Sequence, residues 1–386
     1  MIPAGGARRR GRLLTAAFAV GLTLALVAAC DTTDVQQGNS CSGQGQANSV
    51  ACHQTDDPTT PAPTLTGQGG LTQVSMAMGS EDLAFFGDPR VVAEFKKQGL
   101  QVNATAGLGS VDLALRLNPK GYDAFFLSSQ VLADVAENRL GPHPEYVPFS
   151  TQLEVFTWKP LLPFLRQLGI VNSAGQFDIL QYLNVVRNGT TWRQIPGNTW
   201  YANPNQVLVR TTDPGKSNSG AMFISAAGYV LYTQAQHKSM NYGLQWISAV
   251  SPEIGQLISK EGEMPETTNE EYLDYRRGGE NGAPLALGYQ AEFQGIQPPA
   301  VGELPLAAVA LPLDYPIACD HVVFALTGLG QRVGKLLASD PVLLQLAQQY
   351  GFDTGAAPGD PNPAFDITVP NAHYLLDLID DADPNE

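Results

Sequence analysis

The chain has 386 residues, of which 37 are acidic and 22 are basic, and its formal net charge is −15 at pH 7. This surplus of negative charge repels phosphate backbones and excludes nucleic acid as a partner. The length is sufficient for one large two-lobed domain or for two domains of ordinary size.

The N-terminus has the pattern of a bacterial lipoprotein signal. Four arginines precede an uncharged apolar stretch at 13–29, which ends in two alanines followed by Cys30. Small residues before a cysteine allow cleavage, and the Cys30 thiol would then carry the lipid. The alternative is a membrane anchor, but the stretch is shorter than the roughly 20 residues that span a bilayer. We expect removal of residues 1–29 and a lipid anchor on the extracytoplasmic face of the cell membrane.

Residues 30–69 are rich in polar residues, glycine and proline and contain no aromatic residue, which is typical of a flexible tether. Cys41 and Cys52 both lie in this segment, and an oxidising compartment could join them in a disulfide. Cys319 has no evident mate, so we expect it to be a buried thiol.

From residue 73 onward, short apolar runs alternate with helical periodicity, which predicts an α/β fold. Asp88 and Pro89 begin a helix that Gly99 ends, and Ser128 can cap another helix. The predicted strands of this first part are 73–78, 100–104 and 124–127.

Residues 145–158 are mainly extended, and the chain becomes helical from Lys159, so we expect the first passage between two lobes here. Beyond residue 351 a segment rich in proline, aspartate and glycine follows, with one apolar turn at 374–379. Between these points we predict strands at 206–210, 284–293 and 306–313, helices at 219–233, 330–338 and 341–350, and a polar, largely helical segment at 255–277.

The strongest internal motif is a strand, a turn and a helix start at 207–220. Ser217, Asn218 and Ser219 offer side-chain donors beside the free N–H groups of the first helical turn, which favours an anion or a polar oxygen. A helix cap without a ligand is the alternative. Two enzyme motifs are excluded, because a phosphate-binding loop needs glycine in place of Arg210 and a serine-hydrolase elbow needs glycine in place of Ser219.

The histidines and cysteines give little indication of catalysis or of a metal. No pair has metal-ligand spacing outside the tether, so we expect neither a metal nor a cofactor. Cys319, Asp320 and His321 are adjacent and could form a reactive trio, but we favour a core or surface role for them.

The run Thr-Asp-Pro-x-Lys-Ser-Asn-Ser-Gly at 212–220 resembles the type II extracellular solute-binding proteins of ABC transporters, most of all the molybdate- and sulfate-like branch. The stretches 78–81, 286–292 and 311–337 are also similar to that family. The resemblance implies an α/β fold of two lobes, each with a central mixed sheet flanked by helices. Lobe 1 would comprise 70–155 and 305–352 and lobe 2 would comprise 156–304, followed by an acidic, proline-rich tail at 353–386.

The resemblance also implies which residues bind the solute. Glu81 departs from a simple oxyanion pocket, because a carboxylate repels an anion unless it points away or caps the helix. The expected ligand-binding residues are Gly79, Ser80, Glu81, Ser128 and Ser129 from lobe 1, and Thr211, Ser217, Asn218, Ser219 and Tyr289 from lobe 2.

We therefore expect a monomeric, lipid-anchored protein without enzyme activity that captures a small polar or anionic solute between its lobes. It would deliver this solute to the transmembrane subunits of an ABC-type permease. One alternative is a cell-envelope hydrolase or transferase with a nucleophile in the 217–219 loop. Another is a surface interaction module that kept the fold and lost its ligand.

Overall fold

The computed structural model describes residues 70–199, 201–296, 305, 307–355 and 369–383. These residues all belong to one compact unit, Ser49–Glu386. The predicted signal, the lipidated Cys30, the tether and the Cys41–Cys52 pair lie outside the described residues. Within the described ranges, no helix has the length and apolar character needed to cross a bilayer.

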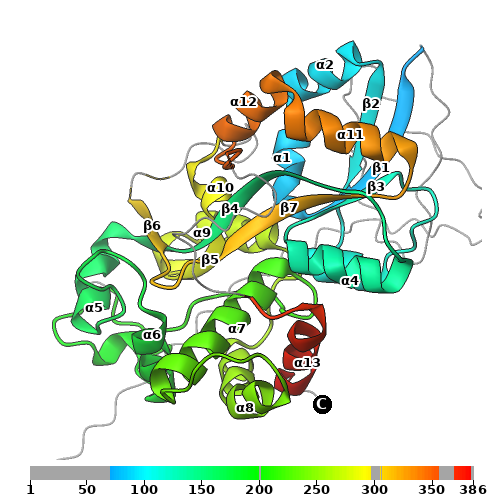
Figure 1. Cartoon of the computed structure of the whole chain (residues 1–386). Helices are drawn as coiled ribbons and strands as arrows, with labels where there is room; N and C mark the ends of the chain where they lie inside the picture. Colours follow the sequence, from blue (N-terminus) through cyan, green and yellow to red (C-terminus); the bar gives the residue numbers. More distant parts are fainter. Residues whose placement is uncertain (1–69, 200, 297–304, 306, 356–368, 384–386) are drawn as a thin grey trace, which may run out of the picture. The chain divides into compact units, whose positions relative to one another are not determined.

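A mixed sheet of seven strands forms the centre of the fold (Figure 1). β1 runs parallel to both β2 and β3, whereas β7 is antiparallel to β3. The strand order is β2-β1-β3-β7-β4-β5, and β6 also pairs with β4. The bounds are β1 (Thr72–Met78), β2 (Leu100–Thr105), β3 (Ala124–Leu127), β4 (Glu145–Trp158), β5 (Ala286–Tyr289), β6 (Ala308–Pro312) and β7 (Ala318–Ala325).

The strand β4 takes part in two pairings along its length. Its first half pairs with β7, and its second half pairs with β5 and β6. The register with β7 shifts between Tyr146 and Phe149, where Pro148 has no N–H to donate to the ladder. One continuous strand therefore connects the two halves of the sheet.

Side chains of β3 alternate between two apolar cores on opposite faces of the sheet. Phe125 and Leu127 pack in one core with Val131 of α4 (Gln130–Leu140). Phe126 packs in the other core with Val333 of α11 (Gly328–Ser339). All four positions of β3 are buried, so this short strand is covered on both faces.

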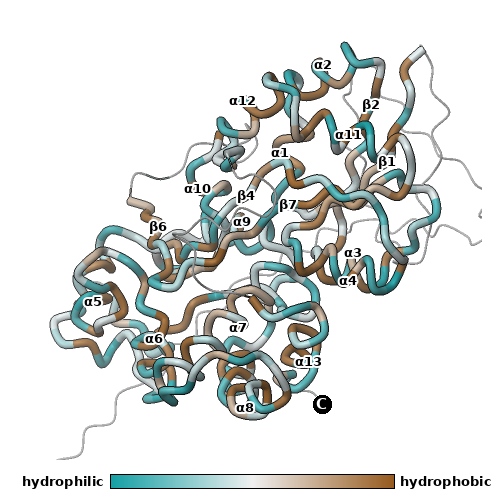
Figure 2. The backbone as a smooth tube through the Cα atoms, viewed as in Figure 1, coloured by the Kyte–Doolittle hydropathy of each residue, from teal (hydrophilic) through white to brown (hydrophobic). Residues whose placement is uncertain are grey.

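Several helices begin at a side-chain cap that the sequence supplies. Asp88 accepts a hydrogen bond from the Arg90 N–H at the start of α2 (Pro89–Lys97), and Asp340 does the same for α12 (Pro341–Gln349). Figure 2 shows apolar and polar segments alternating along α2, α4 and α8, as expected of amphipathic helices with one buried face. The short helices of this half are α1 (Leu83–Phe86), α3 (Ser110–Arg116) and the 3₁₀ turn η1 (Ser80–Asp82).

The other half of the fold is mainly helical. Its central helix is α7 (Asn218–Val230), almost all of whose residues are buried, and a π-helical turn (Leu231–Ala235) continues it. Trp246 of α8 is fully buried and donates its indole N–H to the carbonyl of Gly228. The remaining helices are α5 (Leu162–Gln167), α6 (Ile179–Arg187), α8 (Leu244–Glu261), α9 (Thr268–Gly282) and α10 (Gln290–Gln294).

Several predicted elements differ from the structure. Residues 206–210 form no strand, because Arg210 makes only an isolated bridge to Ala286. The predicted strand 284–293 is β5 followed by α10. The segment 255–277 is largely helical, as predicted, and is formed by parts of α8 and α9 with 262–267 between them. Ser129, not Ser128, is the N-cap residue of α4, and its side chain makes no cap hydrogen bond.

The C-terminal segment contains a helix where the sequence suggested a tail with an apolar turn. Helix α13 (Ala372–Ala382) packs on α8, and Leu375 and Leu378 are fully buried. Asn371 caps it by accepting the N–H of Tyr374. The apolar spacing at 374–379 is thus the buried face of a helix that belongs to the body.

Candidate functional site

Two loops of the predicted site meet at the carboxyl ends of the parallel strands β1 and β3. The backbone N–H of Gly79 donates to the carbonyl of Phe126 at 3.4 Å, and Ser128 Oγ donates to a carboxylate oxygen of Glu81. Ser110 Oγ lies 2.6 Å from Ser128 Oγ. The structure therefore brings Gly79, Glu81 and Ser128 together, as the sequence predicted.

The side chain of Asn218 connects the predicted 217–219 loop to the loop that contains Ser128 and Ser129. The Asn218 amide group donates to the carbonyl of Ser128 at 3.1 Å and to the Tyr289 hydroxyl at 2.9 Å, and Asn218 Oδ1 accepts from Ser129 Oγ at 2.7 Å. Asn218 is 1 % exposed, so these bonds form in the protein interior. Asn218 therefore connects three of the predicted residues.

The hydroxyls of the 217–219 loop are satisfied by other protein groups. Ser219 Oγ lies 2.8 Å from both the Thr212 and Thr268 hydroxyls, and Ser217 Oγ lies 3.2 Å from that of Thr268. Thr211 donates its backbone N–H and its hydroxyl to Glu261. These side chains are buried in a hydrogen-bonded cluster, so they stabilise the loop and do not face an open site.

A cavity of about 80 Å³ opens beside this loop junction. Ser80, Glu81 and Tyr289 of the predicted set line it, and Gly79, Ser128, Ser129, Thr211, Ser217, Asn218 and Ser219 do not. The complete lining is Ser80, Glu81, Leu83, Ala84, Asn269, Tyr272, Tyr289, Ala291, Glu292, Ile296, Tyr350 and Phe352.

The lining combines carboxylates with aromatic rings. Glu81 and Glu292 supply the carboxylates, and three tyrosines with Phe352 supply the rings. None of the lining residues is lysine, arginine or histidine. The cavity is consequently acidic and aromatic, in contrast to the donor-rich pocket that the 217–220 motif indicated.

The surrounding protein changes the ionisation of both carboxylates. Burial, reinforced by the neighbouring Asp82, raises the pKa of Glu81 to about 7. Burial also raises the pKa of Glu292 to about 8, and repulsion by Glu81 adds to this rise, although Glu292 accepts the backbone N–H of Tyr289 at 3.0 Å. The pKa values of both carboxyl groups therefore lie near neutral pH, and a cation bound beside them would favour their charged forms.

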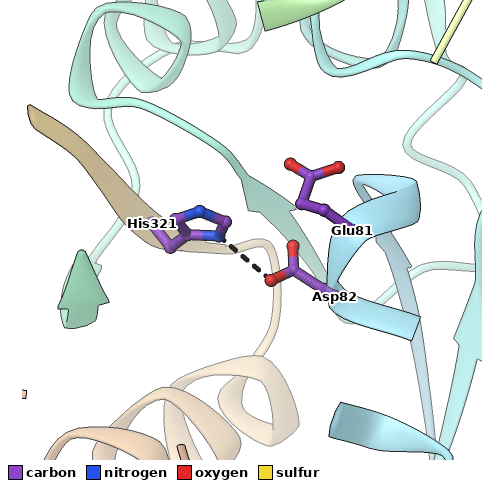
Figure 3. A group of neighbouring side chains, drawn as sticks. All are labelled: Glu81, Asp82 and His321. Atoms are coloured by element: carbon purple, nitrogen blue, oxygen red, sulfur yellow. Dashed lines mark ion pairs between the residues drawn. The ribbon is translucent and has the colours of Figure 1, made fainter. Parts of the chain in front are cut away.

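Behind Glu81 lies a fully buried ion pair between Asp82 and His321. His321 Nδ1 lies 3.1 Å from Asp82 Oδ1 (Figure 3), and a Glu81 carboxylate oxygen lies within 4.8 Å of both groups. Burial disfavours the imidazolium, but the charge and hydrogen bond of Asp82, together with the charges of Glu81 and Asp320, outweigh this effect and raise the pKa of His321. The His321 ring also lies near the Phe352 and Tyr289 rings, at centroid distances of 5.2 and 6.2 Å. The pair thus supports the wall of the cavity from behind.

Glu81, Asp82 and His321 are also the residues that could hold a metal ion. Each offers one ligand atom, and these atoms lie within 4.8 Å of one another. Imidazole and carboxylate ligands suit a transition-metal ion such as Zn²⁺. The sequence did not predict this group, because Asp82 and His321 are far apart in the chain and have no motif spacing.

Other cavity residues that sequence analysis missed come from α9, α10 and the end of α12. Glu292 stands inside the family-like stretch 286–292, which is a signal that could have identified it. Tyr350 ends a predicted helix, and Tyr272 lies in a segment that appeared merely polar. Their convergence is a property of the fold, so local pattern gave no signal for it.

No protein-family model and no curated protein sequence matches the chain. Among solved structures, a periplasmic thiamin binding protein matches with a TM-score of 0.51 and 13% identity, over 83% of this chain and 98% of that one. The sulfate-binding protein SubI from Mycobacterium tuberculosis H37Rv has a TM-score of 0.48 and 14% identity, over 76% of this chain and 88% of that one. The chain therefore has the two-lobed α/β fold of periplasmic binding proteins, as predicted.

Proposed function

We propose that this chain is a lipid-anchored, extracytoplasmic solute-binding protein that captures a small polar solute between its two lobes. The observation that supports this most directly is the cavity, because its lining comes from both halves of the fold. Ser80 and Glu81 follow β1, whereas Tyr289 ends β5 and Glu292 lies in α10. A solute in this cavity would contact both halves at once and would favour the closed arrangement.

We assign the lobes as the sequence suggested, with 70–155 and 305–352 in lobe 1 and 156–304 in lobe 2. The pairings of β7 with the first half of β4 and of β5 with its second half support this division. β6, which the division places in lobe 1, pairs with the second half of β4 beside β5. Ser80, Glu81 and Tyr289 would contact the solute. Gly79, Ser128, Ser129 and Asn218 would position those residues, and Thr211, Ser217 and Ser219 would hold the 217–220 loop.

Delivery to the transmembrane subunits of an ABC-type permease completes the proposal. The lipoprotein signal at 1–29 and Cys30 supports attachment at the outer face of the membrane, close to such a permease. A monomer would suffice, because a single chain supplies the whole cavity lining.

The envelope-enzyme alternative has less support. Ser217 would need a base, but its hydroxyl contacts the hydroxyls of Ser219 and Thr268, which are not general bases. The interaction-module alternative expects a filled cleft, and the cavity of about 80 Å³ weighs against it.

A thermal-unfolding screen tests the proposal on the full chain. The protein would be heated with amines, inorganic oxyanions, amino acids and sugars, and at least one class is expected to raise the melting temperature. Ala84 lines the cavity, so Ala84→Phe should abolish that rise, whereas Ala174→Phe at an exposed position should not. Equal stabilisation of both variants, or no stabilisation of the parent protein by any class, would refute the proposal.

A further inference from the structure

We propose that the solute is a small organic cation that carries a protonated primary amine. This inference rests on the proposed solute-binding function and specifies the chemistry of its ligand. It differs from the expectation of an anion that the donor-rich 217–220 motif raised. Three observations support this inference. They are the charge of the cavity lining, its aromatic rings, and the hydrogen bonds that already satisfy the donors of the 217–220 loop.

The charge of the lining is the first argument. Glu81 projects from η1 and Glu292 from α10, and no basic side chain is among the twelve lining residues to balance them. An anion in this cavity would add a further negative charge to a partly desolvated site, which is strongly unfavourable. A cation would instead convert two repelling carboxylates into a charge-assisted hydrogen-bonding site.

The aromatic rings are the second argument. Tyr272, Tyr289, Tyr350 and Phe352 all line the cavity. All three tyrosine hydroxyls have partners in the protein, since Tyr272 accepts from Arg276 at 3.2 Å, Tyr289 accepts from Asn218 and Tyr350 donates to Asp88 at 3.0 Å. Aromatic rings attract ammonium groups through their π faces and also pack against the alkyl part of an amine.

The state of the expected anion donors is the third argument. Ser128, Ser217 and Ser219 bond to other protein groups and do not line the cavity. At the start of α7, the Gly220 N–H donates to the Thr212 hydroxyl at 2.9 Å. The motif that suggested an anion therefore stabilises the loop, and the site beside it has mainly acceptor character.

The size of the cavity limits the cation. Its volume of about 80 Å³ is smaller than the roughly 150 Å³ of an engineered cavity that holds benzene. A compact aliphatic amine satisfies this limit. A primary ammonium has three N–H donors, more than the two needed for one hydrogen bond to each carboxylate, whereas a quaternary ammonium has none.

Isothermal titration calorimetry on the dialysed full chain tests the inference. Ethanolamine and putrescine are the amine probes, tetramethylammonium is a cation without N–H donors, and sulfate, phosphate, molybdate and glucose represent other classes. MnCl₂ and ZnCl₂ probe the Glu81–Asp82–His321 group. We expect saturable binding of a primary amine, with weaker binding of tetramethylammonium.

Variants connect the binding to the cavity. Glu81→Gln and Glu292→Gln remove the charge with little change of shape, and each should weaken amine binding about tenfold or more. Glu137→Gln makes the same change at an exposed position of α4 and should leave the affinity unchanged. Two glutamine variants are used so that one remains informative if the other fails to fold, which thermal unfolding would reveal.

The outcomes separate this inference from the proposed function. Amine binding that both glutamine variants weaken supports both. Binding of an anion or sugar without amine binding overturns the inference and leaves the proposed function intact. Binding of only the metal ions also overturns the inference. Binding of none of the probes, with no thermal stabilisation in the wider screen, overturns both.

Discussion

Among the residues that the structure describes, five glutamates have pKa values well above the ordinary value of 4.5, and burial is the main cause in each case. Glu261 and Glu271 lie near 8, like Glu292, and Glu154 lies near 7, like Glu81. Glu271 lies beside an arginine, with Arg210 Nε at 3.4 Å from its carboxylate oxygen. The interior therefore favours neutral carboxylic acids over carboxylates.

These shifts predict how the stability of the unliganded protein depends on pH. A folded pKa above the unfolded value means that the folded chain binds more protons between about pH 4.5 and 8, so stability falls as the pH rises through this window. Thermal melting should be highest near pH 5 and should decrease toward pH 8. Melting curves across this range would check the slope, and Glu271→Gln should make it shallower. A melting temperature that rises from pH 5 to pH 8 would contradict the prediction.

Close backbone approach makes one glycine necessary at the loop junction. A Cβ on Gly109 would lie 2.2 Å from the carbonyl oxygen of Lys216, the same oxygen that accepts the N–H of Val111 at 2.9 Å. A methyl group there would push the 217–220 loop away from α3. This contact explains why the two loops of the site can meet.

Gly109→Ala is therefore expected to destabilise the protein by about 1–3 kcal/mol. Gly107→Ala is the matched control, because a Cβ at that exposed position meets nothing within 4 Å. Urea unfolding of both variants measures the difference. Equal midpoints for the two variants would show that the close approach has no energetic consequence.

The helices and strands with a strong local sequence pattern were predicted. Those that depend on pairing with distant strands were not. β1, β2 and β3 and the helices α2, α11 and α12 all occur where apolar periodicity, caps and glycine stops placed them. β7 was not predicted, although it is the central strand that pairs with both β3 and β4. Its polar Asp320 and its glycine-free flanks gave no clear strand boundary.

The candidate site was predictable only in part, for the same reason. Ser80 and Glu81 stood in a recognisable loop and Tyr289 on a predicted strand, and Asn218, predicted as a ligand contact, bonds to Tyr289. The acidic and aromatic character of the cavity depends on Glu292, Tyr350 and Phe352, which reach one place only through the fold. The sequence indicated a donor site at the 217–220 loop because the groups that satisfy its hydroxyls, such as Thr268, lie far away in the sequence.

Helix α13 provides a direct test of packing at the element scale. Leu378 is fully buried between α13 and the body, whereas Leu376 on the same helix is only partly buried. Leu378→Ala should cost about 2–5 kcal/mol and Leu376→Ala clearly less. Urea unfolding distinguishes them, and a similar small cost for both would show that the C-terminal helix is a dispensable tail.

At the scale of the whole molecule, charge and cavity chemistry agree. The net charge of −15 attracts cations at low ionic strength, and the cavity lining has the same sign. β4 passes through both halves of the fold, so a solute held between Glu81 and Glu292 would stabilise their closed arrangement without altering the strand itself. Capture of a solute, rather than chemistry on it, is the function that this arrangement favours.

Native mass spectrometry of the protein purified without denaturation tests the central claim most directly. We predict one small organic molecule for each chain, released on unfolding and identified as an amine, and lost from a Glu81→Gln, Glu292→Gln double variant. Detection of the same bound molecule at the same occupancy in the double variant would contradict the account, as would a bound inorganic anion in the parent protein.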